Sequence, residues 1–310
     1  MLVYTVRRIL LTFPLVVVVV AAVGSLIYVV PGSPVDLILG DYATEADRLE
    51  LMRSLGLDRS FLEQLSTYVQ GVLQGDWGVS LLSGQSVLES LMLHITPTLI
   101  LTLSSMLCAV VFGVPIGVYA ALHKGKWLDS ILMFGSLLLV SMPNFWLGPL
   151  LILIFSLWLD LLPVTEFGTL RGMILPSVTL GGSLSGIVAR MTRESVVVSI
   201  QQDFYVTALA KGLSRSRVLW CHVLRHASIH VVSIIGLQFG ALLTVAVITE
   251  AIFDWPGLGT LMFKALSERD YPLVQGCVIV FSMSYILMNL LTDLVYVKVD
   301  PRVDLYDIEN

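Results

Sequence analysis

Three histidines, His222, His226 and His230, recur every four residues and would share one face of a helix. This spacing can present imidazole ligands to a metal ion. No carboxylate lies close by in the sequence to complete such a site, and the neighbouring Cys221 lies off the face that the three histidines share. The pattern therefore favours a partly solvated helix face at a membrane boundary, and we expect no metal site.

Sequence motifs for catalysis and nucleotide binding are absent. Gly125-Lys126-Trp127 lacks both the upstream glycine and the following hydroxyl residue of a phosphate-binding loop. Neither His-Glu-x-x-His nor Gly-x-Ser-x-Gly occurs. The cysteines are scattered in or beside apolar stretches and predict buried thiols, not a disulfide frame: Cys108, Cys221 and Cys277. We expect a non-catalytic chain without a cofactor of its own.

The longest basic, helix-compatible stretch runs over residues 203–217 and continues to 227. Small residues at 208, 210 and 212 stand beside cations at 211, 215 and 217. The pattern predicts a short helix, a break at Gly212 and a second, amphipathic helix. Small side chains permit a close protein contact, and Lys or Arg can pair with acids of a partner. The alternative is a solvated loop whose positive charge only fixes the orientation of the chain in the membrane. That alternative does not explain why small residues cluster in this stretch. We interpret the stretch as a docking element.

The composition shows whether the rest of the chain is surrounded by water or by lipid. Hydrophobic residues make up 56%, charged residues 13%, and the mean hydropathy is +0.87. Soluble domains carry about 25% charged residues, so we expect an all-α, polytopic membrane protein. A crossing helix needs roughly 20 apolar residues. Six stretches qualify, and the first is interpreted as a retained span, not a signal peptide: about 9–30, 97–121, 130–158, 173–189, 230–252 and 273–297.

Two of these spans have unusual features. The third is too long for one vertical crossing, and Pro143-Asn144 inside it predicts a kink or a tilted helix. The fourth is short and rich in small residues, with Pro176 near its start, which predicts close packing against neighbouring helices.

The distribution of Lys and Arg predicts that both termini are cytoplasmic. With that orientation the inner pieces hold twelve cations: Arg7, Arg8, Lys124, Lys126, Arg190, Arg193, Lys211, Arg215, Arg217, Arg225, Lys298 and Arg302. The outer pieces hold Arg48, Arg53, Arg59, Arg171, Lys264 and Arg269.

The outer segment between the first two spans is acidic. Residues 44–73 predict an amphipathic helix, with Leu49, Met52, Leu55, Leu62, Leu65 and Val69 at helical spacing, and Gly75-Asp76-Trp77-Gly78 predicts a turn.

Charged residues inside spans usually mark ion or proton pathways. Asp293, near the inner end of the last span, is the main one that we identify, and we interpret it as an interfacial or capping acid. A stand-alone secondary carrier is therefore disfavoured. Five polar residues are candidates to line a pathway, with interhelical hydrogen bonds as the alternative for each: Asn144, Gln238, Thr244, Thr249 and Asn289.

The docking element resembles the EAA loop of ATP-binding-cassette importer permeases, in the form found in the dipeptide/oligopeptide/nickel subfamily. Ala208 and Gly212 match the loop's second alanine and its glycine, and Thr207 stands at the first alanine, where this subfamily often has threonine. Val206 occupies the position of the motif's glutamate, and His226 replaces a common asparagine.

Ten further landmarks resemble the subfamily in order along nearly the whole chain: Arg7-Arg8, Pro31-Gly32-Ser33-Pro34, Leu55-Gly56-Leu57-Asp58, Gly75-Asp76-Trp77-Gly78-Val79-Ser80, Pro97-Thr98-Leu99, Pro143-Asn144-Phe145-Trp146, Leu175-Pro176, Trp255-Pro256-Gly257-Leu258-Gly259, Arg269-Asp270-Tyr271-Pro272 and Asp300-Pro301-Arg302. The large outer segment resembles the first of the two permeases that such systems pair.

The resemblance implies a type I importer permease fold with six transmembrane helices in a bacterial inner membrane. It implies four regions: a tip and first span over 1–30, an outer helical segment over 31–96, a permease core over 97–297 that contains the coupling loop 203–227, and a cytoplasmic tail over 298–310. The implied partners are a homologous second permease, two ATPases that carry ATP and Mg, an extracytoplasmic solute-binding protein and the lipid bilayer, with no nucleic acid. The residues implied to couple to an ATPase are Phe204, Thr207, Ala208, Lys211, Gly212, Leu213, Arg215 and Arg217.

The substrate stays open. Peptide, glutathione, opine and nickel or metal-chelate systems share these landmarks, and small peptides are our first expectation. Ser141-Met142-Pro143-Asn144-Phe145-Trp146-Leu147 somewhat resembles nickel-type members. A secondary carrier or channel, or a membrane scaffold or receptor, are the alternatives of another class.

Overall fold

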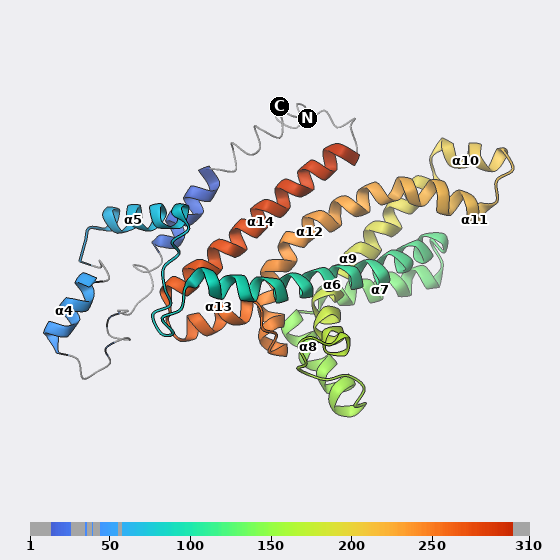
Figure 1. Ribbon diagram of the computed structural model, residues 1–310. Coiled ribbons are helices and arrows are strands. Elements are labelled where there is room, and N and C mark those ends of the chain that lie inside the picture. The colour runs from blue at the N-terminus through green and yellow to red at the C-terminus, as the bar shows by residue number, and fades with distance from the viewer. Residues whose placement is uncertain (1–13, 26–34, 36–38, 40–43, 55–57, 300–310) are drawn as a thin grey trace. The chain divides into compact units, whose positions relative to one another are not determined.

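The computed structural model describes residues 14–25, 35, 39, 44–54 and 58–299 (Figure 1). The predicted all-α class is confirmed: these residues form helices, and one isolated bridge, Val79 to Ser86, is the β-pairing among them. An apolar helix, Pro14–Gly24, precedes the helices that Figure 1 labels. Those helices are α4 Glu45–Ser54, α5 Phe61–Gln74, α6 Val87–Leu122, α7 Trp127–Ser141, α8 Asn144–Leu151, α9 Leu170–Ile200, α10 Asp203–Ala210, α11 Arg215–Val218, α12 Leu224–Phe253, α13 Leu258–Ser267 and α14 Tyr271–Val299. Two π-helical turns, Ile152–Trp158 and Leu219–Val223, continue α8 and precede α12.

Four of these helices contain stretches long and apolar enough to cross a membrane: Val87–Leu122, Leu170–Ile200, His230–Phe253 and Tyr271–Thr292. The pair Trp127–Ser141 and Asn144–Trp158 gives a fifth span if it is counted as one. The helix Pro14–Gly24 falls within the predicted first span, whose flanking residues lie outside the described part of the chain. The count of six therefore stays a prediction. Arg7-Arg8, Pro31–Pro34, Leu55–Leu57 and Asp300–Arg302 also lie outside the described residues.

The predicted kink in the third span is a complete break. Met142 and Pro143 have extended backbones, α7 ends at Ser141, and the two helical halves are bent by 106°. Proline favours this geometry because it disfavours helical φ/ψ in the residue before it and cannot donate a backbone hydrogen bond. The fourth span is longer than expected, since α9 runs for 31 residues.

The chain divides into two compact units. The first unit comprises residues up to Thr98 together with Pro256–Ile286, and the second comprises Leu99–Trp255 together with Leu287 onward. The second unit contains the docking element, and α9 is its most enclosed helix. In the most apolar window of α9, 72% of residues are buried, against 28–33% in the other long apolar helices. The remaining helices leave wide apolar faces for lipid or for another subunit.

Small residues bring α6 and α7 close to α9 within the second unit, as predicted for the fourth span. A Cβ atom added to Gly186 of α9 would lie 2.4 Å from the Ser136 carbonyl oxygen of α7. On α6, Gly113 and Gly117 form a Gly-x-x-x-Gly pair that the sequence analysis missed. A Cβ atom on Gly117 would lie 2.4 Å from the Ala189 carbonyl oxygen. The helix backbones therefore meet directly, which is how glycine pairs stabilise helix contacts in a bilayer.

This packing predicts opposite outcomes for two glycine-to-alanine substitutions. Gly117→Ala forces α6 away from α9 and is expected to lower the free energy of unfolding by about 1–3 kcal/mol. Gly135→Ala is the matched control, because Gly135 lies within α7 and an added Cβ there meets no atom within 4 Å. It should be neutral or slightly stabilising, since alanine favours a helix over glycine by about 1 kcal/mol. Thermal unfolding of the purified protein in detergent measures both, and equal shifts would contradict the close contact.

The outer segment of the first unit contains two helices, where one amphipathic helix over 44–73 was predicted. The α5 helix begins with a capping box formed by Ser60 and Glu63, and its Val72 is buried with Val20, Val23 and Ile279. In contrast, Leu49 and Leu62 are exposed. The predicted turn at residues 75–78 is confirmed, because Gly75 and Gly78 have φ values of +87° and +79°.

Asp270 joins the outer segment to the start of α14 inside the first unit. Its buried carboxylate accepts a short hydrogen bond from the Ser80 hydroxyl and further bonds from the backbone N–H groups of Leu81, at 3.3 Å, and Leu273, at 3.4 Å. Thr98 accepts a hydrogen bond from the Leu258 N–H at 2.8 Å, at the start of α13. Residues far apart in the sequence thus form one hydrogen-bonded outer structure.

Candidate coupling surface

The docking element forms the predicted arrangement of a short helix, a glycine break and a second helix. The α10 helix ends at Ala210, and Gly212 has a φ of +83°, a conformation that strongly favours glycine. The chain then turns into α11, where the Ser214 hydroxyl caps the helix by accepting a hydrogen bond from the Arg217 N–H at 3.4 Å. The glycine lets α10 and α11 follow one another without a longer loop.

One face of α10 packs against the rest of the second unit. Ala208 is 9% exposed and lies in a buried apolar cluster with Val118 and Ala121 of α6, Val196 of α9, and Val218, Val223 and Ala227. Phe204 and Leu213 pack against the same cluster. These three residues were predicted to contact an ATPase, but their side chains hold α10 to its own chain. A direct contact of these three residues with an ATPase stays a prediction.

The opposite face of α10 is exposed. It carries Val206, Thr207 and Ala210, followed by Lys211 and Gly212 in the turn. Val206 is 65% exposed although it is a large apolar residue. Two residues along a helix correspond to a rotation of about 200°, so Val206 must point away when Ala208 points inward. The sequence analysis treated Val206 only as a departure from the family motif, and its outward position follows only once the structure shows that Ala208 is buried.

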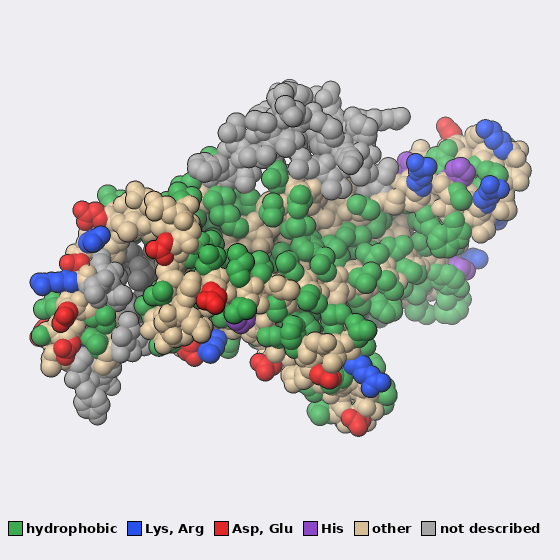
Figure 2. Space-filling model, viewed as in Figure 1, with side chains coloured by type: hydrophobic (Ala, Val, Ile, Leu, Met, Phe, Trp, Pro, Cys, Tyr) green, Lys and Arg blue, Asp and Glu red, His purple; other side chains and the backbone are tan. Residues whose placement is uncertain are grey.

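Arg215 and Arg217 are both exposed on α11, as a partner contact requires. Figure 2 shows Lys and Arg side chains gathered over α10 and α11. Together with the exposed face of α10 they form what we call the coupling surface: Val206, Thr207, Ala210, Lys211, Gly212, Arg215 and Arg217.

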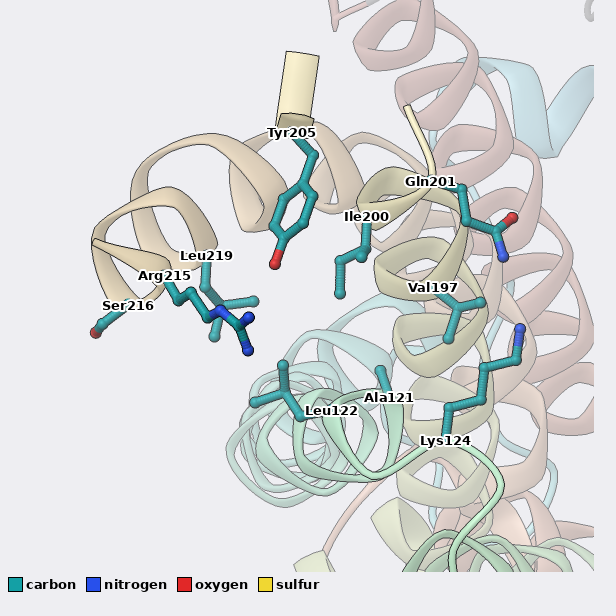
Figure 3. Close-up of a pocket in the computed structure, with 10 residues that line it drawn as sticks. All are labelled: Ala121, Leu122, Lys124, Val197, Ile200, Gln201, Tyr205, Arg215, Ser216 and Leu219. Carbon is teal, nitrogen blue, oxygen red and sulfur yellow. The ribbon is translucent and has the colours of Figure 1, made fainter. Parts of the chain in front are cut away.

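A groove of about 570 Å³ opens beside the coupling surface (Figure 3). Ala121 and Leu122 of α6, Val197 and Ile200 of α9, and Leu219 supply its apolar lining. Its polar lining residues are Lys124, Gln201, Tyr205, Arg215 and Ser216. The groove thus separates part of the docking element from the end of α6.

An ion pair fixes α7 to α9 near the same end of the second unit. The Arg193 Nε donates to Asp129 Oδ1 and the Arg193 Nη2 donates to Asp129 Oδ2, both at 2.6 Å. The Gly125 N–H also donates to Asp129 Oδ2, at 3.1 Å, from the turn between α6 and α7. Asp129 is only 5% exposed. A two-pronged Arg–carboxylate contact of this kind is both strong and geometrically specific, so it sets the position of α9 just before α10.

His226 makes a second link between helices. Ser199 donates its hydroxyl hydrogen to the Ser195 carbonyl oxygen at 2.7 Å, so the His226 Nδ1, 3.0 Å from the Ser199 oxygen, acts as the donor in that contact. The His226 ring also lies 5.4 Å from the Phe204 ring, between centroids. Within the described part of the chain, no group of three or more His, Cys, Asp or Glu residues is arranged to hold a metal ion.

The five candidate pathway residues of the second unit differ in their exposure. Asn144, Gln238 and Asn289 are half-buried, and Asn144 begins α8 at the 106° break. Thr244 is exposed and its hydroxyl donates to the Gly240 carbonyl at 3.5 Å within its own helix. Thr249 is fully buried, and its hydroxyl has no hydrogen-bond partner among the described residues. A lining role for these residues stays a prediction.

Glu250 is a buried acid that the sequence analysis missed. It lies in the fifth predicted span and is 0% exposed. The statement that Asp293 was the main charged residue inside the spans is therefore wrong. The average hydropathy of the surrounding stretch concealed this carboxylate, because one acid in a mostly apolar stretch of more than 20 residues barely changes the mean.

Two family models match the chain. One, described as the binding-protein-dependent transport system inner membrane component, matches residues 113–305, which include α10, α11 and the ion pair. This chain belongs to that family. The N-terminal model of the same transport-system component matches residues 1–102. The chain is therefore an inner-membrane permease of a binding-protein-dependent, ATP-binding-cassette importer, as the resemblance implied.

Curated relatives match along the full length of the permease. The glutathione transport system permease protein GsiC of Escherichia coli (strain K12) is 39% identical over 304 residues, covering 98% of this chain and 99% of the relative. GsiC of Salmonella typhi is 40% identical with the same coverage. A solved structure, an inward-facing conformation of the MetNI methionine ABC transporter, superposes with a TM-score of 0.56 at 17% identity, covering 69% of this chain and 97% of that one. This likeness shows a shared importer permease fold.

Proposed function

We propose that the permease works by receiving force at the coupling surface from an ATPase subunit on the cytoplasmic side. Membership of the family shows that the chain is an importer permease. The coupling surface itself is supported by the contrast between the buried and the exposed face of α10. Its inner face is packed into the permease core, and its outer face exposes small and apolar residues beside cations. A helix that is packed firmly against the core can transmit a movement of the ATPase to the membrane helices, whereas a loosely attached loop would move without them.

The proposed orientation rests on the clustering of cations at one end of the second unit. The α6–α7 turn and the segment from α10 to the start of α12 expose Lys124, Lys126, Lys211, Arg215, Arg217 and Arg225. Cations concentrate on the cytoplasmic side of membrane proteins. This end would therefore face the cytoplasm, with both termini on the same side, and the outer segment would meet a solute-binding protein.

For the substrate we propose small peptides of the size and type of glutathione, a tripeptide. The two relatives above are named as glutathione permeases, and they match this chain over almost its entire length. Nickel or a metal chelate is the alternative cargo. The pathway would run between this permease and a homologous partner, so this chain would supply one half of its wall.

A stand-alone carrier is the competing function, and buried Glu250 is the observation that favours it. Carboxylates inside spans often relay protons in such carriers. The coupling surface argues against this function, because a carrier that works alone has no use for an exposed docking helix.

Reconstitution into liposomes separates the two functions. The complete assembly, with the second permease, both ATPases and the binding protein, is expected to accumulate labelled glutathione only when ATP and binding protein are both present. The control liposomes contain this permease alone and should accumulate none. Uptake by the permease alone, or uptake driven by a proton gradient without ATP, would overturn the proposal.

A further inference from the structure

The groove beside the coupling surface combines an apolar wall with a polar rim, a combination that a contact with another protein does not require. Apolar side chains from α6, α9 and the turn after α11 form one part of its wall, with Leu122, Ile200 and Leu219 among them. Figure 3 shows the Tyr205 hydroxyl and the Arg215 guanidinium pointing into the same space from α10 and α11. The groove thus has an apolar surface and a polar, hydrogen-bond-donating rim.

The rim is positively charged. Lys124 and Arg215 belong to the lining from two different elements, and the ten lining residues include no Asp or Glu. The nearby Asp129 is already engaged by Arg193 through two hydrogen bonds. An anionic group beside Tyr205 would therefore meet the Arg215 guanidinium and the Tyr205 hydroxyl, whereas Figure 3 shows Lys124 on the other side of the groove, near Val197 and Gln201.

Exposed tryptophans place the groove at the depth of a lipid headgroup layer. Trp127, three residues after Lys124, is 69% exposed, and Trp220, next to Leu219, is 66% exposed. Tryptophan concentrates at membrane–water interfaces, where its ring is partly apolar and its N–H reaches polar groups. Both residues lie close in the sequence to groove-lining residues.

We propose that this groove binds a phospholipid with an anionic headgroup from the cytoplasmic leaflet. Arg215 and Tyr205 would bind the phosphate, Lys124 would attract the anionic headgroup from the other side of the groove, and the apolar wall would contact the first part of an acyl chain. Basic pockets between helices on the cytoplasmic side are typical sites for such headgroups. The volume of about 570 Å³ falls in the range of roughly 300–1,000 Å³ that is usual for small-molecule sites.

Such a lipid would lie between α10–α11 and the end of α6. It would contact Arg215 and Tyr205 of the docking element together with Leu122 and Lys124 of α6 and its following turn. The position of the coupling surface relative to the membrane helices would then depend on the lipid. This inference goes beyond the proposed function, since it concerns a ligand that is neither cargo nor partner protein.

Photo-crosslinking of the intact transporter in nanodiscs tests the proposal. The probe is phosphatidylglycerol with a photoreactive group near the start of one acyl chain, and labelled peptides are identified by mass spectrometry. Wild type should be labelled in the peptides that contain residues 119–124 and 197–219. The double variant Lys124→Gln/Arg215→Gln is expected to lose at least fivefold of this labelling.

The matched control is Lys126→Gln/Arg217→Gln, which removes two exposed cations from the same two segments that do not line the groove. Its labelling should stay within twofold of wild type. A third variant, Ile200→Trp, keeps both cations but fills the apolar part of the groove, and should also lose labelling. This variant distinguishes a lodged lipid from general attraction to a basic surface.

Four outcomes would overturn the proposal. Equal labelling in both double variants would show no site, and equal labelling by a phosphatidylcholine probe would show no preference for an anion. Competition by soluble glycerol phosphate would identify a free phosphate as the ligand. Labelling that appears only after the ATPases are removed would show that an acidic segment of the partner fills the groove.

Discussion

Replacing Val206 and Ala210 with aspartate is expected to abolish ATP-driven uptake and to release the ATPase from the purified assembly. Both side chains lie on the exposed face of α10. In the proposed contact they would become desolvated, and burying an unpaired carboxylate costs several kcal/mol. Since each 1.4 kcal/mol is a factor of about ten in affinity, ATPase binding should fall by at least 100-fold. Co-purification and uptake in proteoliposomes measure the two effects.

The two faces of α10 supply the control for this experiment. Ala208→Asp places the same charge on the inner face, where the side chain is 9% exposed. That variant should lower the unfolding temperature of the permease itself, whereas the Val206→Asp/Ala210→Asp variant should unfold at the wild-type temperature. A double variant that retains normal ATPase stoichiometry and uptake would show that the exposed face of α10 is not the coupling surface.

The second large effect is expected from Asp129→Asn, which leaves the Arg193 guanidinium without its counterion. Breaking a buried pair by removing one partner typically costs about 3–5 kcal/mol, and we expect about 3 because Arg193 retains some exposure. For a protein of this size the unfolding temperature should fall by on the order of 10 °C. Thermal unfolding in detergent measures the shift. The physical reason is the loss of a two-pronged contact that holds α7 and the α6–α7 turn against α9.

Two companion variants identify the cause of that loss. Glu194→Gln neutralises an exposed acid next to Arg193 and should change the unfolding temperature by no more than 2 °C, because exposed charges contribute about 0–1 kcal/mol. The double variant Asp129→Leu/Arg193→Met removes both charges and should recover most of the stability, since apolar pairs often replace buried ion pairs without loss. Failure of the double variant to recover would show that the unpaired Arg193 charge is not the cause of the loss.

Local patterns predicted the elements that depend on neighbouring residues. Small residues and a glycine among helix formers were enough to predict α10, its break at Gly212 and α11, because the left-handed turn is a property of that glycine alone. Pro143 predicted a disruption in the third span. Its angle of 106° depends on packing against α9 and α12, which no local pattern contains.

Contacts between distant residues were not predictable in the same way. Asp129 and Arg193 are 64 positions apart, and in the sequence each alone is an ordinary charge near a span end. The inner and outer faces of α10 could not be assigned from the sequence alone either, because Ala208 and Ala210 are chemically identical. Only the surfaces that α6 and α9 present decide which alanine is buried.

The separation of α10 into two faces has a consequence for how importers of this family diversify. In the proposed contact, changes on the buried face would alter the fold of the permease, whereas changes on the exposed face would alter only the match with its ATPase. Substitution of a few exposed side chains could therefore decide whether each of several related permeases binds its own ATPase or shares one ATPase with the others. Transfer of the exposed α10 residues of one permease to another should change which ATPase binds, while the transported substrate stays the same.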